Sequence, residues 1–150
     1  MSNLKVYLDT SVFSAYYDDR AKMRQEQTIE FWGRLGEYDK FASEMVIDEL
    51  NAVSDDKLRA DLIQLTRDFK ILQVNQESEA LAEIYIKRGI FPEKYREDAI
   101  HLALASVNGI DILVSWNFEH LVKRKTRLEA NEANILNGYK TIDIIAPPEL

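Results

Sequence analysis

The sequence predicts an α/β protein, a three-layer α/β/α sandwich in which helices cover both faces of a central, mainly parallel sheet. Short apolar strands alternate with amphipathic helices along the 150 residues, as in parallel sheets whose strands are joined by helical crossovers. The runs at 6–8 and 110–115 are mostly apolar, which is typical of strands buried on both faces. Both runs end abruptly in polar residues, at the sheet edge where ligands collect in such folds.

The first half of the chain supplies three strands. The expected elements are a strand at 6–8, helices at 11–17 and 23–38, a weak strand at 41–43, helices at 44–53 and 56–69, and a strand at 71–74. The helices are assigned from apolar residues that recur every three or four positions, as Leu58, Leu62 and Leu65 do.

The second half continues the alternation. The expected elements are helices at 77–88 and 95–108, a strand at 110–115, a helical turn at 118–122, a helix through Leu128, Ile135 and Leu136, and a final strand at 139–145. Gly89 and Gly109 follow the first two helices, where a glycine often ends a helix.

Composition narrows the possible functions. The length suits one domain over residues 1–150, with roughly 70% of the unfolded chain's surface buried on folding. Because cysteine is absent, disulfides, thiolate catalysis and zinc–thiolate sites are excluded. The sequence has neither a signal-like start nor a membrane-length apolar run, so we expect a soluble, cytoplasmic protein without membrane contacts. A net charge of -7 argues against nucleic-acid binding through a broadly basic surface.

The acidic residues suggest a metal site. Asp9 follows the first strand, Glu49 and Asp98 lie on helices, and Asn117 and Glu119 follow the strand at 110–115. Oxygen ligands from separate segments suit Mg²⁺ or Mn²⁺. Each acid also has a simpler interpretation, because Asp9 can cap a helix, Glu49 can face solvent, and Asp98 can favour a helix start through the helix dipole.

Several motifs, taken in order, resemble the PIN-domain family, and most of all the toxins of VapBC-type toxin–antitoxin pairs. They are Leu8-Asp9-Thr10-Ser11, Val46-Ile47-Asp48-Glu49-Leu50, Arg96-Glu97-Asp98-Ala99-Ile100-His101-Leu102-Ala103 and Ile112-Leu113-Val114-Ser115-Trp116-Asn117. The resemblance implies a PIN-like parallel sheet and an acidic pocket that binds Mg²⁺ or Mn²⁺ and cleaves RNA. It assigns Asp9, Glu49 and Asp98 as the core ligands. It also implies a small cognate antitoxin and a homodimer.

The fourth acidic position departs from that pattern, because the family usually has an acid where this sequence has Asn117. Asn117 can offer a neutral carbonyl oxygen, and Glu119 can supply the missing charge or remain a solvated acid. Ser11 resembles the hydroxyl residue beside the first acid, where it would orient that carboxylate or a bound water. Asp111 precedes its strand, so we expect it at the opposite end of the sheet, in a structural role.

Other residues near these motifs allow two interpretations each. Trp116 can stack a base of the substrate or pack into the fold. Lys123 and Arg124 can hold flanking phosphates or form a solvated helix start. His101 lies one turn after Asp98, and a packed or supporting role is favoured over catalysis.

Two other classes of function compete with a nuclease that uses metal-activated water. One is a PIN scaffold with weakened catalysis that acts as a binding or regulatory module, which Asn117 makes credible. The other is a phosphatase or phosphotransfer domain built on Asp9. A phosphatase would be expected to carry a second acid two residues later, where Ser11 stands, so this class is less favoured.

Overall fold

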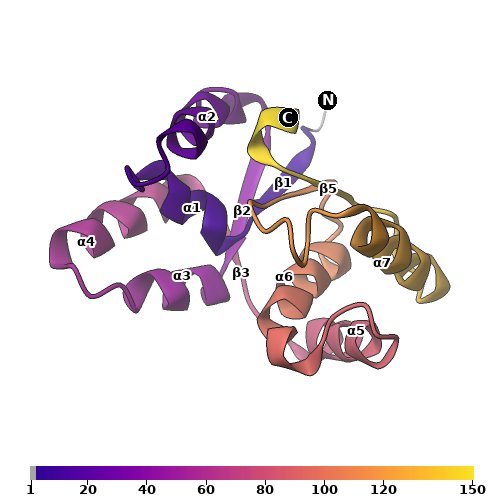
Figure 1. Cartoon of the computed structure of the whole chain (residues 1–150). Coiled ribbons are helices and arrows are strands. Elements are labelled where there is room, and N and C mark those ends of the chain that lie inside the picture. Colours follow the sequence, from indigo (N-terminus) through magenta and orange to yellow (C-terminus); the bar gives the residue numbers. More distant parts are fainter. Residues whose placement is uncertain (1–2) are drawn as a thin grey trace.

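The computed structural model describes residues 3–150 and contains a five-stranded sheet between two groups of helices (Figure 1). The strands are β1 (Lys5–Leu8), β2 (Asp39–Ser43), β3 (Lys70–Leu72), β4 (Ile112–Val114) and β5 (Asp143–Ile145). Every strand pair is parallel. The predicted α/β/α sandwich with a parallel sheet is therefore confirmed.

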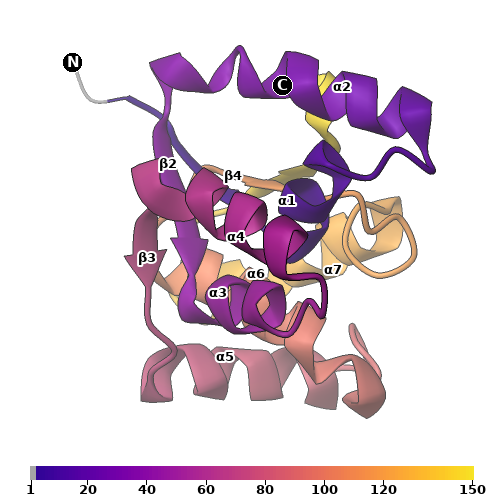
Figure 2. The ribbon, with the colours of Figure 1, turned by 90° about the vertical axis from the view of Figure 1, so that its left-hand side faces the viewer.

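The helices divide between the two faces of the sheet. They are α1 (Thr10–Tyr16), α2 (Lys22–Trp32), α3 (Glu44–Asn51), α4 (Asp56–Leu65), α5 (Gln76–Lys87), α6 (Arg96–Val107) and α7 (Arg124–Leu136). Helix α1 contacts α2, α3 and α4, and α5 contacts both α6 and α7. Figure 2 has α1, α3 and α4 in front of the sheet and α6 and α7 behind it. Among residues 3–150, no helix combines the length and apolar character needed to cross a membrane.

The strand order is β3-β2-β1-β4-β5, so the chain changes direction at the centre of the sheet. From β1 it builds outward through β2 and β3, and it then returns to place β4 and β5 on the other side of β1. In open α/β sheets, the carboxyl ends of strands at such a reversal form the usual ligand site. Leu8 pairs with Val114, so the residues that follow, Asp9 and Ser115, lie next to each other at this edge.

The hydrophobic core draws on most elements, and the central strands and α6 are its most deeply buried parts. Val6, Tyr7 and Leu8 are fully buried, which agrees with a strand covered on both faces. Helix α6 is buried around most of its circumference. Ala99, Ala103 and other small residues allow α6 to pack closely against its neighbours on several sides.

Some predicted element boundaries were wrong. The helix expected at 23–38 ends at Trp32, and the one expected at 56–69 ends at Leu65, and each is followed by a short 3₁₀ turn. The final strand, expected at 139–145, starts only at Asp143. Residues 118–122 form a hydrogen-bonded turn, closed by the bond from Leu121 N to Asn117 O. Apolar residues continue into these flanking turns, so periodicity alone overestimates helix length.

Helix α7 shows how far burial can depart from residue type. Leu128, Ile135 and Leu136 are 58–67% exposed. The face that packs inward is formed by Thr126, Ala130, Ala133 and Asn134. Asn134 can be buried there because Tyr85 and Ser106 satisfy its amide.

Candidate active site

Asp9 is fixed at the carboxyl end of β1 by three hydrogen bonds. Its Oδ1 accepts from Ser11 N at 3.1 Å and from Ser11 Oγ, while its Oδ2 accepts from Ser115 Oγ. The bond from Ser11 N makes Asp9 the N-cap of α1. The side chain is almost entirely buried, so its orientation is set by these donors.

Two serines connect Asp9 to the loop that follows β4. Ser11 Oγ accepts from Trp116 N at 2.9 Å, and Ser115 Oγ accepts from Asn117 N at the same distance. Each hydroxyl therefore donates to the carboxylate and accepts from the loop backbone. Ser115 was not among the predicted site residues, because its position opposite Asp9 follows from the β1–β4 register.

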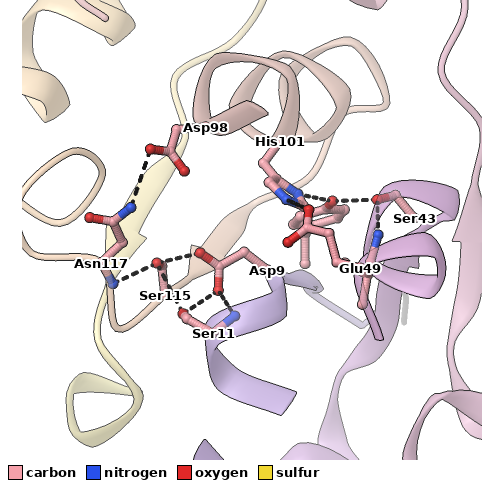
Figure 3. A network of polar contacts seen from close by, with 10 residues as sticks. Asp9, Ser11, Ser43, Glu49, Asp98, His101, Ser115 and Asn117 are labelled. Carbon is pink, nitrogen blue, oxygen red and sulfur yellow. Dashed lines mark hydrogen bonds and ion pairs between the residues drawn. The ribbon is translucent and has the colours of Figure 1, made fainter. Parts of the chain in front are cut away.

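Glu49 extends from α3 toward His101 on α6. His101 Nε2 lies 3.2 Å from Glu49 Oε1, and His101 Nδ1 lies 2.6 Å from the hydroxyl of Tyr7. Tyr7 in turn donates to Ser43 Oγ at 2.8 Å, and Ser43 caps α3 by accepting from Val46 N. Figure 3 shows His101, Glu49 and Ser43 of this chain of contacts beside Asp9. Sequence reasoning did not assign Tyr7 or Ser43 to the site, because a tyrosine in a buried strand resembles any other core residue.

Asp98 lies in the first turn of α6 and accepts from Asn117. Asn117 Nδ2 donates to Asp98 Oδ2 at 3.3 Å, and Asn117 Oδ1 accepts from His120 N at 3.0 Å. Both ends of the amide are thus engaged. Glu119 is 87% exposed at its side chain, and its Oε2 lies 3.8 Å from His120 Nε2. Glu119 is therefore at the periphery of the site, in contact with solvent.

Burial and neighbouring charge shift the pKa values of the site. Burial raises the pKa of Asp9 and of Asp98 above the ordinary value, and the charge of Asp9 raises that of Asp98 further. Burial also opposes charge on Glu49 and His101. Their mutual hydrogen bond and the opposite charges around them together outweigh burial, so that the net pKa of Glu49 is lowered and that of His101 is raised. Glu49 and His101 thus stabilise each other's charged form, whereas the charge of Asp9 disfavours the charged form of Asp98.

The site suits a hard cation by its chemistry. Its ligand candidates are oxygens of Asp9, Glu49 and Asp98, the donor type that Mg²⁺ and Mn²⁺ prefer. Thr10 Oγ1 is the one buried side-chain polar atom in residues 3–150 that has no hydrogen-bond partner. It lies near enough to Glu49 to favour its charged form. Among residues 3–150, no three Asp, Glu or His side chains are close enough together to hold an ion.

The residues considered for substrate contact lie in two different environments. Trp116 is 7% exposed. Its Nε1 donates to Thr28 Oγ1, and the Arg24 guanidinium covers its ring at 4.8 Å from the ring centroid. Trp116 is therefore packed into the fold. Lys123 and Arg124 are exposed where α7 begins.

Asp111 lies at the opposite end of the sheet, as expected. It accepts from Lys5 N at 2.8 Å and pairs with Lys140 Nζ at 2.6 Å. These contacts attach the starts of β1 and β4 to the segment before β5, which is a structural role.

The chain is a parallel α/β protein with acidic side chains at the carboxyl ends of its central strands, where the strand order reverses. Comparison with known proteins identifies its family. The model of the PIN domain matches residues 6–137. The chain therefore belongs to the PIN-domain family. Among curated proteins, none matches the sequence significantly.

Solved structures with the same fold include VapC toxins and VapBC complexes. VapC20 of Mycobacterium tuberculosis, described as a sarcin–ricin loop cleaving toxin, is 19% identical with a TM-score of 0.61, over 77% of this chain and 92% of that one. DNA-bound VapBC from Salmonella typhimurium is 12% identical with a TM-score of 0.62, over 96% and 98% of the two chains. VapBC-1 from nontypeable Haemophilus influenzae is 13% identical with a TM-score of 0.60, over the same shares.

Proposed function

We propose that this protein is a metal-dependent endoribonuclease and the toxin of a toxin–antitoxin pair. The observation that carries the proposal is the buried Asp9 at the reversal of the sheet, flanked by Asp98 from α6 and Glu49 from α3 (Figure 3). Membership of the PIN-domain family and the similarity in fold to a toxin that cleaves the sarcin–ricin loop support it.

Asp9, Glu49 and Asp98 would hold Mg²⁺ or Mn²⁺. When bound, the ion polarises the phosphoryl group and lowers the pKa of an attacking water. Ser11 and Ser115 donate to Asp9 and fix the plane of its carboxylate.

Asn117 orients Asp98 in the same way, by donating to its Oδ2. Since Asn117 is neutral, it adds no charge at the fourth position, and Glu119 at the periphery is the remaining candidate for that charge. The number of ions held therefore depends on whether Glu119 turns inward.

RNA must approach a protein whose net charge is -7. A cluster of carboxylates repels the phosphodiester backbone unless a cation reverses the local charge, so metal is obligatory in this proposal. Lys123 and Arg124 are exposed at the start of α7, where they would hold phosphates that flank the cleaved bond.

The deciding experiment is cleavage of single-stranded and loop-containing RNA by purified protein. We expect cleavage with Mg²⁺ or Mn²⁺, none in EDTA, and none from Asp98→Asn, which removes one charge at nearly constant shape. Asp48→Asn is the matched control, because Asp48 is an exposed acid next to Glu49 on α3. Equal cleavage by the parent and Asp98→Asn, or loss of activity in Asp48→Asn, would contradict the proposal.

The expected partner is a small antitoxin with a basic segment. Two of the similar structures are described as VapBC complexes bound to DNA. In this chain, an Arg or Lys of the partner would take the place of the metal among Asp9, Glu49 and Asp98 and so block catalysis. Co-expression with a small protein encoded beside this one tests the idea, since independent elution of the two proteins would exclude that partner. A homodimer is expected from the family resemblance, and sedimentation would measure it.

The second candidate function is a catalytically weakened PIN scaffold that binds a partner. The engaged amide of Asn117 favours it, because Asn117 Oδ1 already accepts from His120 N and offers little to a second ion. Protein that is inert on varied RNAs in both its parent and Asn117→Asp forms, yet still binds an antitoxin, would establish this function instead.

A further inference from the structure

His101 is a buried polar residue with a hydrogen-bonding contact at each ring nitrogen. It lies one turn after Asp98 on α6 and is 3% exposed. Nε2 contacts Glu49 Oε1, and Nδ1 contacts the Tyr7 hydroxyl. Turning the ring over would place carbon atoms against both partners, so only one orientation satisfies them.

The direction of these bonds follows from the protons available. A glutamate is ordinarily ionised at neutral pH, and a carboxylate can only accept a hydrogen bond. Nε2 of His101 must therefore carry the hydrogen of this contact. At the other end, the Tyr7 hydroxyl lies between Nδ1 of His101 and Ser43 Oγ, to which it donates. The chain of hydrogen-bonding contacts therefore runs from His101 in both directions.

This chain ties Glu49 to three separate elements. Tyr7 lies in β1, Ser43 joins β2 to the start of α3, and His101 lies on α6. Glu49 itself is only partly buried, with 35% of its side chain exposed. The glutamate side chain has three rotatable bonds. Holding it in one orientation costs conformational entropy, which a hydrogen-bond partner must offset. Nε2 of His101, 3.2 Å from Glu49 Oε1, supplies such a partner.

We propose that His101 is a positioning residue, which holds the carboxylate of Glu49 in place for metal binding alongside Asp98 from its own helix. Asp98 and His101 are three residues apart on α6, so this helix carries one ligand candidate and the donor that aims a second. The inference rests on the proposed function only in taking Glu49 as a metal ligand.

A matched pair of amides tests it. In His101→Gln the amide is long enough to reach Glu49, and in His101→Asn it is shorter by one methylene. Calorimetry with Mn²⁺ should show affinity close to the parent for His101→Gln and about tenfold weaker for His101→Asn, the loss typical of a removed supporting contact. Equal affinities of the two folded variants would overturn the proposal, as would an unchanged affinity in Glu49→Gln.

Tyr7→Phe provides a second measurement if His101→Asn does not fold. It removes the hydroxyl that fixes Nδ1 while leaving the contact between His101 and Glu49 in place. The ring is then held at one end, and the Mn²⁺ affinity should fall, but by less than the tenfold loss expected for His101→Asn. An unchanged affinity would count against positioning through this chain.

The outcomes separate this inference from the nuclease proposal. If the parent cleaves no RNA while the Mn²⁺ affinities follow the expected order, positioning stands and the nuclease proposal fails. If the parent cleaves RNA and both amide variants bind Mn²⁺ equally, the nuclease proposal stands and positioning fails.

Discussion

Asn117 Nδ2 donates to Asp98 Oδ2 at 3.3 Å, and this contact joins the loop after β4 to the first turn of α6. The same amide accepts from His120 N through its Oδ1. A carboxylate at position 117 would have no hydrogen to donate and would face Asp98 with like charge. Asparagine thus stabilises the metal-free arrangement in a way that an acid would not.

Asn117→Asp should destabilise the folded protein in the absence of metal and raise its affinity for Mn²⁺. The substitution replaces a hydrogen bond with repulsion between two carboxylates, which we expect to cost about 1–3 kcal/mol. With Mn²⁺ present, the added charge becomes a ligand and the loss should be recovered. Melting temperatures with EDTA and with Mn²⁺ measure both effects. A variant as stable as the parent in EDTA would mean that positions 98 and 117 do not interact.

Ser115→Ala should lower metal affinity by loosening Asp9. Ser115 Oγ donates to Asp9 Oδ2 and accepts from Asn117 N, so the variant leaves one acceptor and one donor without a partner. We expect about tenfold weaker Mn²⁺ binding and a stability cost of about 1–3 kcal/mol. Ser54→Ala, at an exposed serine after α3, is the control. A Ser115→Ala protein with parental affinity would show that Ser11 alone orients Asp9.

Asp98→Asn should stabilise the metal-free protein near neutral pH. The pKa of Asp98 is raised on folding, mainly by burial, so the folded state holds this proton more tightly than the unfolded chain. Ionisation therefore costs stability as the pH rises from the ordinary Asp value through the raised one, and asparagine avoids that cost. Partial exposure screens the effect, so we expect a gain of about 1 kcal/mol or less.

Thermal unfolding in EDTA at several pH values tests this prediction. The difference between Asp98→Asn and the parent should be present at pH 7 and shrink toward about pH 4, near the ordinary pKa of an aspartate. A constant difference across this range would show that the charge of Asp98 is not its cause.

Trp116→Ala should act on stability. The ring is packed against Arg24 and bonded to Thr28, and truncating a buried aromatic typically costs about 3–5 kcal/mol. Trp116→Phe keeps most of the apolar contact and should lose less. Denaturant unfolding measures both losses. A Trp116→Ala protein of parental stability with weakened RNA binding would instead support stacking of a base on Trp116.

Lys123→Gln and Arg124→Gln should weaken RNA binding with little change in stability. Both side chains are exposed at the start of α7, and each phosphate contact removed should reduce the dependence of binding on salt. Fluorescence anisotropy over a range of salt concentrations, with catalytically inactive Asp98→Asn as the background, measures this. Binding that is unchanged at low salt would assign both residues to a solvated helix start.

The order of elements follows from sequence because strands and helices impose different periods on apolar residues. The buried strand at 6–8 and the helices around Glu49 and Asp98 were predicted from these patterns, and the structure has the corresponding elements. Asp9 was expected either to cap a helix or to bind a cation. The structure shows the cap, and the cation is still a proposal.

Hydrophobic periodicity does not predict which face of α7 is exposed. Leu128, Ile135 and Leu136 are apolar yet exposed, while Asn134 is buried. Burial there depends on which neighbours satisfy a polar group, and Tyr85 comes from an element about fifty residues away. A period within one helix contains no information about that neighbour.

The sequence by itself determined the alternation of strands and helices and the position of each acid within its element, because local periodicity and capping depend on nearby residues. Only the tertiary structure decided the strand order that places Ser115 beside Asp9, and the approach of α6 to α3 that brings His101 to Glu49. These contacts join residues 106 and 52 positions apart. They are fixed by packing around a shared core, and no local pattern records which distant side chains will meet there.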